Sequence, residues 1–522
     1  MNFSTIDIII FIAYGLLIIG IGWWVSREKE GHEKTSSDYF LAGKSLPWWA
    51  IGASLIASNI SAEQFIGMSG SGYALGLGIA TYEWMAALTL IVVAKFFLPI
   101  FIEKRIFTLP QFLELRYDSR IRTILAVFWV LLYTFVNLSS VLYLSSLALT
   151  VVLGITMWQS IIGLAVVAVA YSIYGGLKAV AWTDVVQVVF LIIGGLITTY
   201  LALNAVSEGA GAWAGMETLY DRVPEKFDMI LSKDNPFYKD LPGISVLIGG
   251  MWIANLSYWG CNQYIIQRAL AAKTTAEAQR GLAFAGYLKL ILPLVVVIPG
   301  IAAFVLGADL NRYDEAYPWL LSNLVPVGIK GLAFAALIAA ALSSLSSMMN
   351  STATIFTMDL YKPFINPGAS ETRLVTVGRI VGLISMIIAV LVAQPLLGGE
   401  EQVFQFIQKY TGYVSPGIVV LFLFGLFWKR TTATAALWTA IASVPFSIAI
   451  DLLFPEMPFL DQMGLVFLLL SALIIAISLA TSHTASPKAI RFGTNLFTTG
   501  PVFNALAMGI ILILGALYAM FW

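Results

Sequence analysis

Residues 57–72 read ASNISAEQFIGMSGSG, and this stretch decides how the rest of the chain is interpreted. It lies within an apolar run, yet it carries Asn59, Glu63 and Gln64 among several serines and glycines. Such residues weaken a helical ladder, and free carbonyls at membrane depth are tolerated only where they line a cavity or bind an ion. The stretch therefore predicts a broken membrane helix at a binding site. A kinked helix with small residues for close packing is the alternative.

The whole chain has the composition of a membrane protein. Its 522 residues are 59% hydrophobic and only 11% charged, which is outside the usual range of soluble domains. Apolar runs of about 20 residues, each long enough to cross a bilayer as a helix, recur along the chain. We therefore expect an all-α polytopic membrane protein with about 14 transmembrane helices. A cleaved signal peptide is not expected, because Asp7 precedes the first run and Arg27 and Lys29 follow it.

Basic residues gather in alternate predicted loops, which the positive-inside rule places in the cytoplasm. These residues are Arg27, Lys29, Lys34, Lys44, Lys104, Arg105, Arg116, Arg120, Arg122, Lys178, Arg268, Lys273, Arg280, Lys362, Arg373, Arg379, Lys429, Arg430, Lys488 and Arg491. The intervening connections are short and uncharged, or rich in acid. Both termini are therefore expected on the extracellular or periplasmic side.

Other function classes find little support in the sequence. The net charge of +0 does not favour nucleic acid. The single Cys261 cannot form an intrachain disulfide, and His32 and His483 fall in separate predicted loops. We therefore expect neither an enzyme nor an organic cofactor. A membrane-embedded sensor or channel is a rival class.

Polar residues interrupt three further spans. Tyr82-Glu83-Trp84 begins one, where an interfacial aromatic belt with a snorkelling acid is the alternative. Asn255-Leu256-Ser257-Tyr258-Trp259, with Asn262 and Gln263 one turn on, combines amides with aromatic rings, which suits a pyranose. Lys289 lies deep in the next run, either paired with an acid such as Glu83 or donating to sugar hydroxyls.

The last polar span is Ser343–Thr352. On a helix, Ser343, Ser347, Asn350 and Ser351 form one stripe. These hydroxyls either bond within their own helix or, together with carbonyls of a broken helix, replace the water of a sodium ion. Asn59-Ile60-Ser61 is echoed by Asn255-Leu256-Ser257 five spans later, where we expect a second break, as in inverted-repeat transporters.

Five long stretches resemble the sodium:solute symporter family, and the likeness runs from end to end. They are FLAGKSLPWWAIGASLIASNISAEQFIGMSGSGY at 40–73, YSIYGGLKAVAWTDVVQ at 171–187, YWGCNQYIIQR at 258–268, SSLSSMMNSTATIFTMDLY at 343–361 and YTGYVSPGI at 410–418. The motifs are most similar to the bacterial sodium/galactose type, a relative of the animal sodium/glucose type. The resemblance implies sodium-driven import of galactose or glucose across the cell inner membrane by alternating access, with a monomer sufficient and oligomers allowed.

The resemblance also implies a five-plus-five inverted-repeat (LeuT-type) core. Its expected parts are an N-terminal helix and cytoplasmic loop at 1–46, the first repeat at 47–206, an extracellular loop at 207–242, the second repeat at 243–430 and three C-terminal helices at 431–522.

The site residues that the resemblance implies fall into four sets. The main sodium site would use Ala57, Ile60, Ala340, Ser343 and Ser344. A second sodium site would use Asp184, Ser343, Ser346 and Ser347, unless Asp184 is a solvated acid at the inner helix end. The sugar would contact Asn59, Gln64, Glu83, Asn137, Asn255, Lys289 and Gln408. The gates would be Met68, Tyr82, Tyr258, Trp259 and Phe404.

One departure concerns the solute. Ala86 stands where the galactose type carries a serine that contacts the sugar, and one neutral hydrogen bond is worth about 0.5 to 1.5 kcal/mol. This loss could shift the preferred sugar but not the solute class. Myo-inositol, sialic acid and proline are the alternative solutes.

Overall fold

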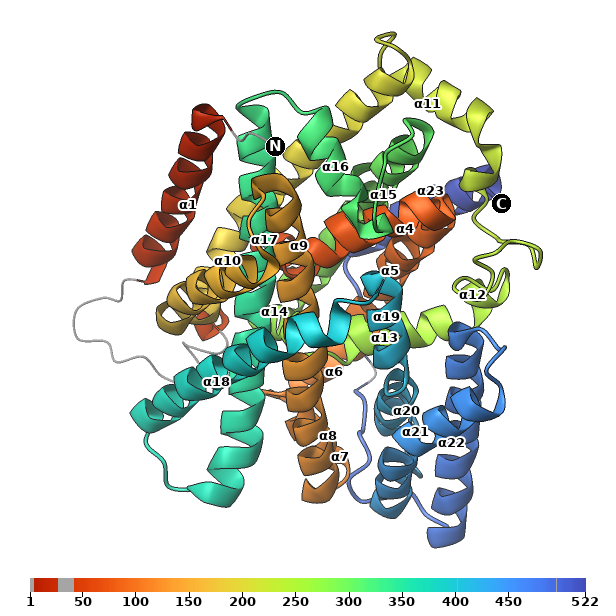
Figure 1. Ribbon diagram of the computed structural model, residues 1–522. Helices are drawn as coiled ribbons and strands as arrows, with labels where there is room; N and C mark the ends of the chain where they lie inside the picture. Colours follow the sequence, from red (N-terminus) through yellow and green to blue (C-terminus); the bar gives the residue numbers. More distant parts are fainter. Residues whose placement is uncertain (1–3, 27–41, 401, 494) are drawn as a thin grey trace.

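The computed structural model describes residues 4–26, 42–400, 402–493 and 495–522, and it leaves the side chains at 23, 43 and 171–179 undescribed. The described part is built of helices (Figure 1). The predicted first cytoplasmic loop, with Arg27, Lys29 and Lys34, lies outside the described residues, as does the side chain of Lys178.

The first half of the chain contains α1 (Thr5–Ser26), α3 (Trp48–Asn59), α4 (Ser69–Leu75), α5 (Thr81–Val92), α6 (Leu98–Glu103), α7 (Leu109–Arg116), α8 (Ser119–Leu132), α9 (Ser139–Leu153), α10 (Met157–Val206) and α11 (Ala212–Arg222). The second half contains α12 (Ser245–Ile248), α13 (Gly250–Gly260), α14 (Gln263–Leu270), α15 (Thr275–Val305), α16 (Ala316–Asn323), α17 (Ile329–Ile355), α18 (Glu371–Leu397), α19 (Val403–Gly412), α20 (Ser415–Phe427), α21 (Ala433–Leu453), α22 (Phe459–Thr481) and α23 (Pro501–Met520). Wider π-helical turns lie at η2 (Glu63–Met68), η4 (Val93–Phe97), η5 (Tyr133–Leu138) and η8 (Phe356–Ile365).

Ten helices of the described part are long and apolar enough to cross a membrane. An eleventh is added if α19 and α20, bent by 48°, are one span. The expected number of 14 is therefore met only in part. Three further apolar segments fall short of an uninterrupted span: the Met157–Ala170 part of α10, the α3–η2–α4 segment and the α13–α14 segment.

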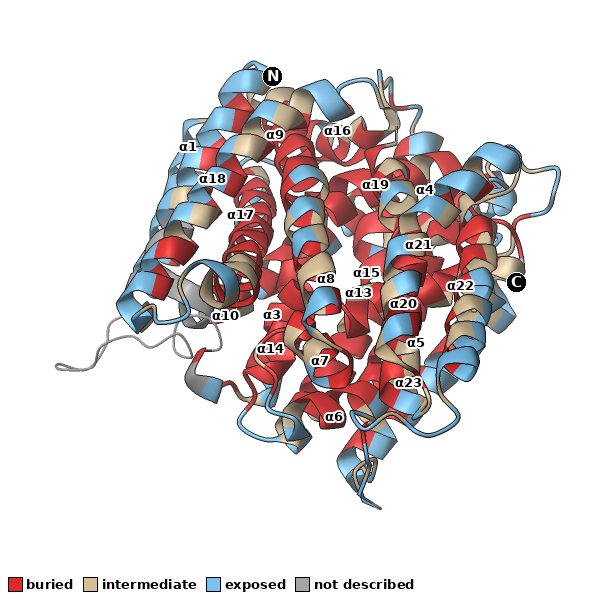
Figure 2. Ribbon diagram, turned by 90° about the horizontal axis from the view of Figure 1, so that it is seen from below, coloured by how far each residue is buried: buried red, intermediate tan, exposed pale blue. Residues whose placement is uncertain are grey.

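Burial separates a central group of helices from a lipid-facing group. In the span that contains α17, 89% of the most apolar window is buried, against 22% for α1 and for α23. Figure 2 shows α3, α13, α15 and α17 as mainly buried, with exposed residues on the outer faces of α1, α21 and α22. The central helices are those that carry the polar segments found in the sequence, so the polar groups lie inside the protein and not against lipid.

Local capping fixes several helix starts. The Thr156 hydroxyl accepts a hydrogen bond from the Gln159 backbone N–H, and the Gln159 side-chain oxygen accepts one from the Thr156 backbone N–H, a capping box that begins α10. The N-terminal helix α1 is attached in a related way. The Asp7 carboxylate, which is fully buried, accepts hydrogen bonds of 2.8 Å from the backbone N–H groups of Gly328 and Gly331. These groups lie at the start of α17, where the helix dipole favours an anion.

The predicted break at residues 57–64 is confirmed. Helix α3 ends at Asn59, Ile60 is extended with φ −73° and ψ 95°, and η2 begins at Glu63. The second break is real, but its predicted position was wrong. Residues 255–257 lie inside α13, and the chain becomes extended at Asn262, with φ −104° and ψ 126°, before α14. Asn255 stays helical because its amide donates to the Met251 carbonyl of the same helix.

Two arginines assigned to loops by their charge are buried. Arg116, on α7, and Arg268, on α14, are both at most 1% exposed. The segment 207–242 also differs from a plain loop, because it contains α11 and a turn of 3₁₀ helix at Pro224–Phe227. The Lys226 ammonium donates to the carbonyls of Tyr73 and Ala74, at 2.7 and 2.6 Å, and so caps the end of α4.

Candidate functional site

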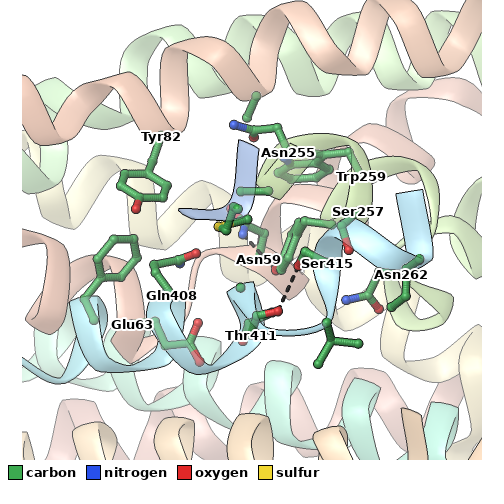
Figure 3. A pocket seen from close by; sticks show the side chains of 18 of the residues that line it. Asn59, Glu63, Tyr82, Asn255, Ser257, Trp259, Asn262, Gln408, Thr411 and Ser415 are labelled. Carbon is green, nitrogen blue, oxygen red and sulfur yellow. Dashed lines mark hydrogen bonds between the residues drawn. The ribbon is translucent and has the colours of Figure 1, made fainter. Parts of the chain in front are cut away.

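A polar cavity lies where the two interrupted helices meet α5, α15 and the bent α19–α20 pair. Its volume is about 70 Å³, room for about five water molecules at 10–15 Å³ each. A space of this size suits one small polar solute. Figure 3 shows Tyr82, Asn255, Gln408 and Glu63 around it.

Six of the seven residues expected to contact the sugar line this cavity: Asn59, Gln64, Glu83, Asn255, Lys289 and Gln408. Asn137 is buried on η5 and is not part of the lining. Ala86 does line the cavity, so the position of the missing serine faces the solute space. The side-chain amide oxygen of Gln64 accepts a hydrogen bond from the Ser61 backbone N–H at 3.1 Å, so this side chain also caps the break.

A buried ion pair forms one wall of the cavity. Lys289, on α15, donates to a Glu83 carboxylate oxygen on α5, and the two side chains are 1% and 4% exposed. The Lys289 ammonium also lies 5.0 Å from the centre of the Trp259 ring, a cation–π contact. Pairing of Lys289 with Glu83 is therefore confirmed, and Glu83 is not an interfacial acid. An ammonium keeps donors for a ligand while it is paired.

Asn59 connects the Lys289–Glu83 ion pair to the aromatic residues Tyr258 and Tyr264. Its carbonyl oxygen accepts a hydrogen bond from Lys289, and its amide donates to the Tyr258 hydroxyl at 2.9 Å. The Tyr258 hydroxyl in turn accepts from Tyr264. Asn59 is the last residue of α3, directly before the break at Ile60. A backbone movement at this break would therefore shift the contacts of Asn59 with Lys289 and with Tyr258 together.

Aromatic pairs bound the cavity. The rings of Tyr82 and Phe404 meet edge to face with centroids 5.2 Å apart. Tyr258 and Trp259 meet in the same way at 5.1 Å. All four residues line the cavity, whereas Met68, also expected at a gate, is fully buried on η2 outside the lining. Both pairs are in contact, so the solute space is enclosed by rings on two sides.

The first break releases backbone oxygens that could bind a cation. The Ser61 N–H donates to the Gln64 side chain instead of the Ala57 carbonyl, which would be its partner in a continuous helix. The Gln64 N–H donates to the Ser61 carbonyl instead of the Ile60 carbonyl. Helix α17 packs on α3 and carries Ala340, Ser343 and Ser344, all buried. The Ser344 hydroxyl donates to the Ser58 carbonyl at 3.0 Å, which places it beside the released oxygens.

The residues expected at a second sodium site are also buried. Asp184, on α10, is 0% exposed, so the alternative of a solvated acid is wrong. Its carboxylate accepts hydrogen bonds from Ser343 and, at 2.6 Å, from Ser54. Ser347 lies one turn after Ser343 on α17, and Ser346 is buried beside it in the sequence.

Three lining residues lie outside the set expected to contact the sugar, although Asn262 belongs to the polar segment predicted after Asn255. Glu63, Asn262 and Thr411 all face the cavity. One Glu63 carboxylate oxygen and the Thr411 hydroxyl are buried without a hydrogen-bond partner, and such groups are costly unless a ligand or water satisfies them. Glu63 stands in the stretch that revealed the break, and its charge was the available signal. Thr411 becomes visible only once the bend between α19 and α20 is known.

Polar side chains that converge between interrupted membrane helices are typical of membrane transporters, which hold small solutes near the bilayer midplane. The chain belongs to the sodium:solute symporter family, whose model matches residues 39–443. The sodium/glucose cotransporter of Vibrio parahaemolyticus is 55% identical to it over 99% of this chain and 98% of that protein. The human sodium/myo-inositol cotransporter 2 is 34% identical over 84% of this chain and 68% of that protein.

Solved structures share the fold. A sodium-coupled sialic acid symporter in a substrate-bound outward-open state matches with a TM-score of 0.79 and 24% identity, over 93% of this chain and all of that one. A nucleobase–cation symporter with a bound bromovinylhydantoin matches with a TM-score of 0.57 and 16% identity. At these identities, the likeness concerns the fold alone.

Proposed function

We propose that this chain is a sodium-coupled symporter that imports a monosaccharide, galactose or glucose, by alternating access. The observation that carries the proposal is the position of Asn59. This residue lies at the break whose carbonyls would bind sodium, and its side chain contacts both Lys289 in the solute cavity and Tyr258 at its edge. Membership of the sodium:solute symporter family supports sodium symport, and the relative named a sodium/glucose cotransporter supports a hexose as the solute.

The mechanism follows from these contacts. Sodium would be held by the carbonyls of Ala57, Ile60 and Ala340 and the hydroxyls of Ser343 and Ser344. This binding would fix the end of α3 and orient Asn59. Lys289 and Glu83 would then offer a donor and an acceptor to the sugar hydroxyls, in a low-dielectric site where such bonds are strong. Each ligand would favour the arrangement that the other needs, which is a reciprocal coupling.

Release of the sugar and sodium would require the cavity to open on the side that Tyr258 and Trp259 bound. The Tyr258 ring would move from Asn59 and Trp259, while Tyr82 and Phe404 stay in contact on the opposite side. A packed aromatic pair has two discrete arrangements, in contact or apart, as alternating access needs.

The finer architecture belongs to the same proposal. Fourteen spans would result if α3–η2–α4, Met157–Ala170 and α13–α14 cross the membrane in addition to the eleven. The repeats would span 47–206 and 243–430, and their first helices are the two interrupted ones. Loop charge supports termini on the external side, the cell inner membrane is the proposed location, and a monomer holds every residue named at the site.

The test is uptake of labelled galactose into proteoliposomes that contain the purified protein. Uptake should require an inward sodium gradient and should disappear when choline replaces sodium. A competition panel of glucose, myo-inositol, sialic acid and proline then ranks the solutes. If unlabelled galactose and glucose compete less well than proline or sialic acid, the sugar assignment is wrong, whereas sodium-independent uptake refutes symport itself.

The variant Ala86→Ser sharpens the choice of sugar. Ala86 lines the cavity, so a hydroxyl there should improve the uptake of one hexose over the other, by about 2- to 12-fold for one neutral hydrogen bond. The measurement is the ratio of kcat/KM for galactose and glucose in the variant and the wild type. An unchanged ratio would show that this position does not contact the sugar.

A further inference from the structure

One wall of the solute cavity is formed by Met463 on α22. Every other described residue of the lining falls within residues 39–443, the part of the chain that the family model matches, whereas α22 lies beyond it. The side chain is 4% exposed, and its thioether sulfur is only a weak hydrogen-bond acceptor. Met463 therefore acts on a solute through its size and shape.

The Met463 side chain occupies the space that a glycine leaves at the bend between α19 and α20. Gly412 is the last residue of α19 and is buried. A Cβ atom on Gly412 would lie 2.9 Å from the Met463 sulfur and 3.3 Å from its Cγ, closer than van der Waals contact allows. The thioether is therefore packed directly against the backbone at the bend, and the two residues form one thin wall, which we call the Met463–Gly412 partition.

A second, smaller pocket lies on the other side of this partition, because Met463 and Gly412 line both spaces. We call it the side pocket. Its volume is about 10 Å³, the space of about one water molecule. Polar side chains of Lys409, Tyr413, Ser447 and Gln462 also line it. The Lys409 ammonium is 3.4 Å from the Asp451 carboxylate and keeps further donors for a ligand.

We propose that Met463 is a specificity-determining residue, which closes the solute cavity towards the side pocket and so restricts transport to unsubstituted hexoses. The proposal rests on the proposed function, because it concerns the solute of that transport. A hexose that carries one further hydroxyalkyl group in this direction overlaps the thioether. Without the three side-chain atoms beyond Cβ, the two spaces join, and the hydroxyl of the added group gains Lys409 as a donor.

The experiment measures uptake into proteoliposomes of galactose and of five derivatives, each with one 2-hydroxyethyl group on the oxygen at C1, C2, C3, C4 or C6. The wild type should reject at least the derivative whose added group points at Met463. In Met463→Ala, kcat/KM for that derivative relative to galactose should rise at least about 10-fold, the lower end of what one methylene is worth in an enclosed pocket. Met463→Leu fills nearly the same volume and should keep the wild-type ratios.

Met386→Ala is the matched control. Met386 lies on α18, is 1% exposed, and lines neither the solute cavity nor the side pocket. This variant loses the same three side-chain atoms from a buried position. It should therefore leave all five ratios of kcat/KM at their wild-type values.

Two results would overturn the proposal while the proposed function stands. A wild type that takes up all five derivatives as readily as galactose shows that Met463 excludes none of them, and this test needs no variant to fold. A monodisperse Met463→Ala protein that transports galactose with all five ratios unchanged shows that Met463 does not set the size limit. A wild type without sodium-dependent galactose uptake refutes the proposed function itself and, with it, this role of Met463, so the galactose control distinguishes the two failures.

Discussion

Replacing Lys289 with methionine tests the ion pair that forms one wall of the cavity. The side chain keeps its length, but Glu83 is left as an unpaired carboxylate. Both side chains are less than 5% exposed, so the pair belongs to the buried class. Removing one partner of such a pair costs about 3 to 5 kcal/mol of folding free energy. We therefore expect Lys289→Met to lower the thermal unfolding temperature clearly.

The same variant should bind sugar poorly, for a separate reason. A hydrogen bond to a charged group contributes about 1.5 to 3 kcal/mol, which corresponds to a 10- to 150-fold rise in KM for sugar uptake. The double variant Glu83→Gln/Lys289→Met separates the two effects. It carries no unpaired charge, so it should recover most of the lost stability, but it should not recover uptake.

The assays are unfolding of the detergent-solubilised protein and galactose uptake in proteoliposomes. Lys239→Met is the control, because the Lys239–Glu456 pair is exposed and such pairs contribute at most about 1 kcal/mol. A double variant whose KM lies within twofold of the wild type would refute a role in sugar binding. The ion pair would then only hold α5 against α15.

Two further outcomes follow from single contacts. Ser344→Ala should raise the sodium concentration at half-maximal uptake by about 2- to 12-fold, the value of one neutral hydrogen bond. The sugar KM at saturating sodium should stay within twofold of the wild-type value. A larger change in the sugar KM than in the sodium dependence would show that Ser344 does not belong to the sodium site. Burial against the end of α4 lowers the pKa of Lys226 to about 8. Because the folded state favours the neutral amine, the unfolding temperature should rise between pH 8 and 10.5, relative to Lys226→Met measured over the same range.

The break near Asn59 could be predicted from sequence because its cause is local. Amide, hydroxyl and glycine residues stand together in an apolar run, and no distant partner is needed to see that a helix is weakened there. The pairing of Lys289 with Glu83 could also be predicted, because a charged side chain inside a membrane protein is costly unless it pairs with an opposite charge. In each case, a polar or charged residue within an apolar run is costly to leave unsatisfied, so the residue itself indicates the feature.

The position of Arg268 could not be predicted in this way. Counting basic residues assigned it to a cytoplasmic loop, but the positive-inside rule contains no information about partners. Its carboxylate partner, Asp184, is 84 residues away in the sequence, and the two meet only because the second break directs α14 towards α10. That break lies at Asn262, after the predicted residues 255–257, because Asn255 donates to the Met251 carbonyl and so stays within α13.

The number of sodium ions carried in each cycle determines how far a sugar could be concentrated. Lys289 balances Glu83, Arg268 balances Asp184, and a hexose is neutral, so the sodium ions are the charge that each cycle adds. One charge that moves down 100 mV contributes about 2.3 kcal/mol, or about a 50-fold sugar ratio. A tenfold sodium gradient raises this ratio to about 500-fold, and a second sodium ion would square the ratio. Steady-state sugar accumulation at a clamped potential therefore measures the number of sodium ions carried in each cycle: a plateau near the lower ratio indicates one ion, and a plateau far above it indicates two.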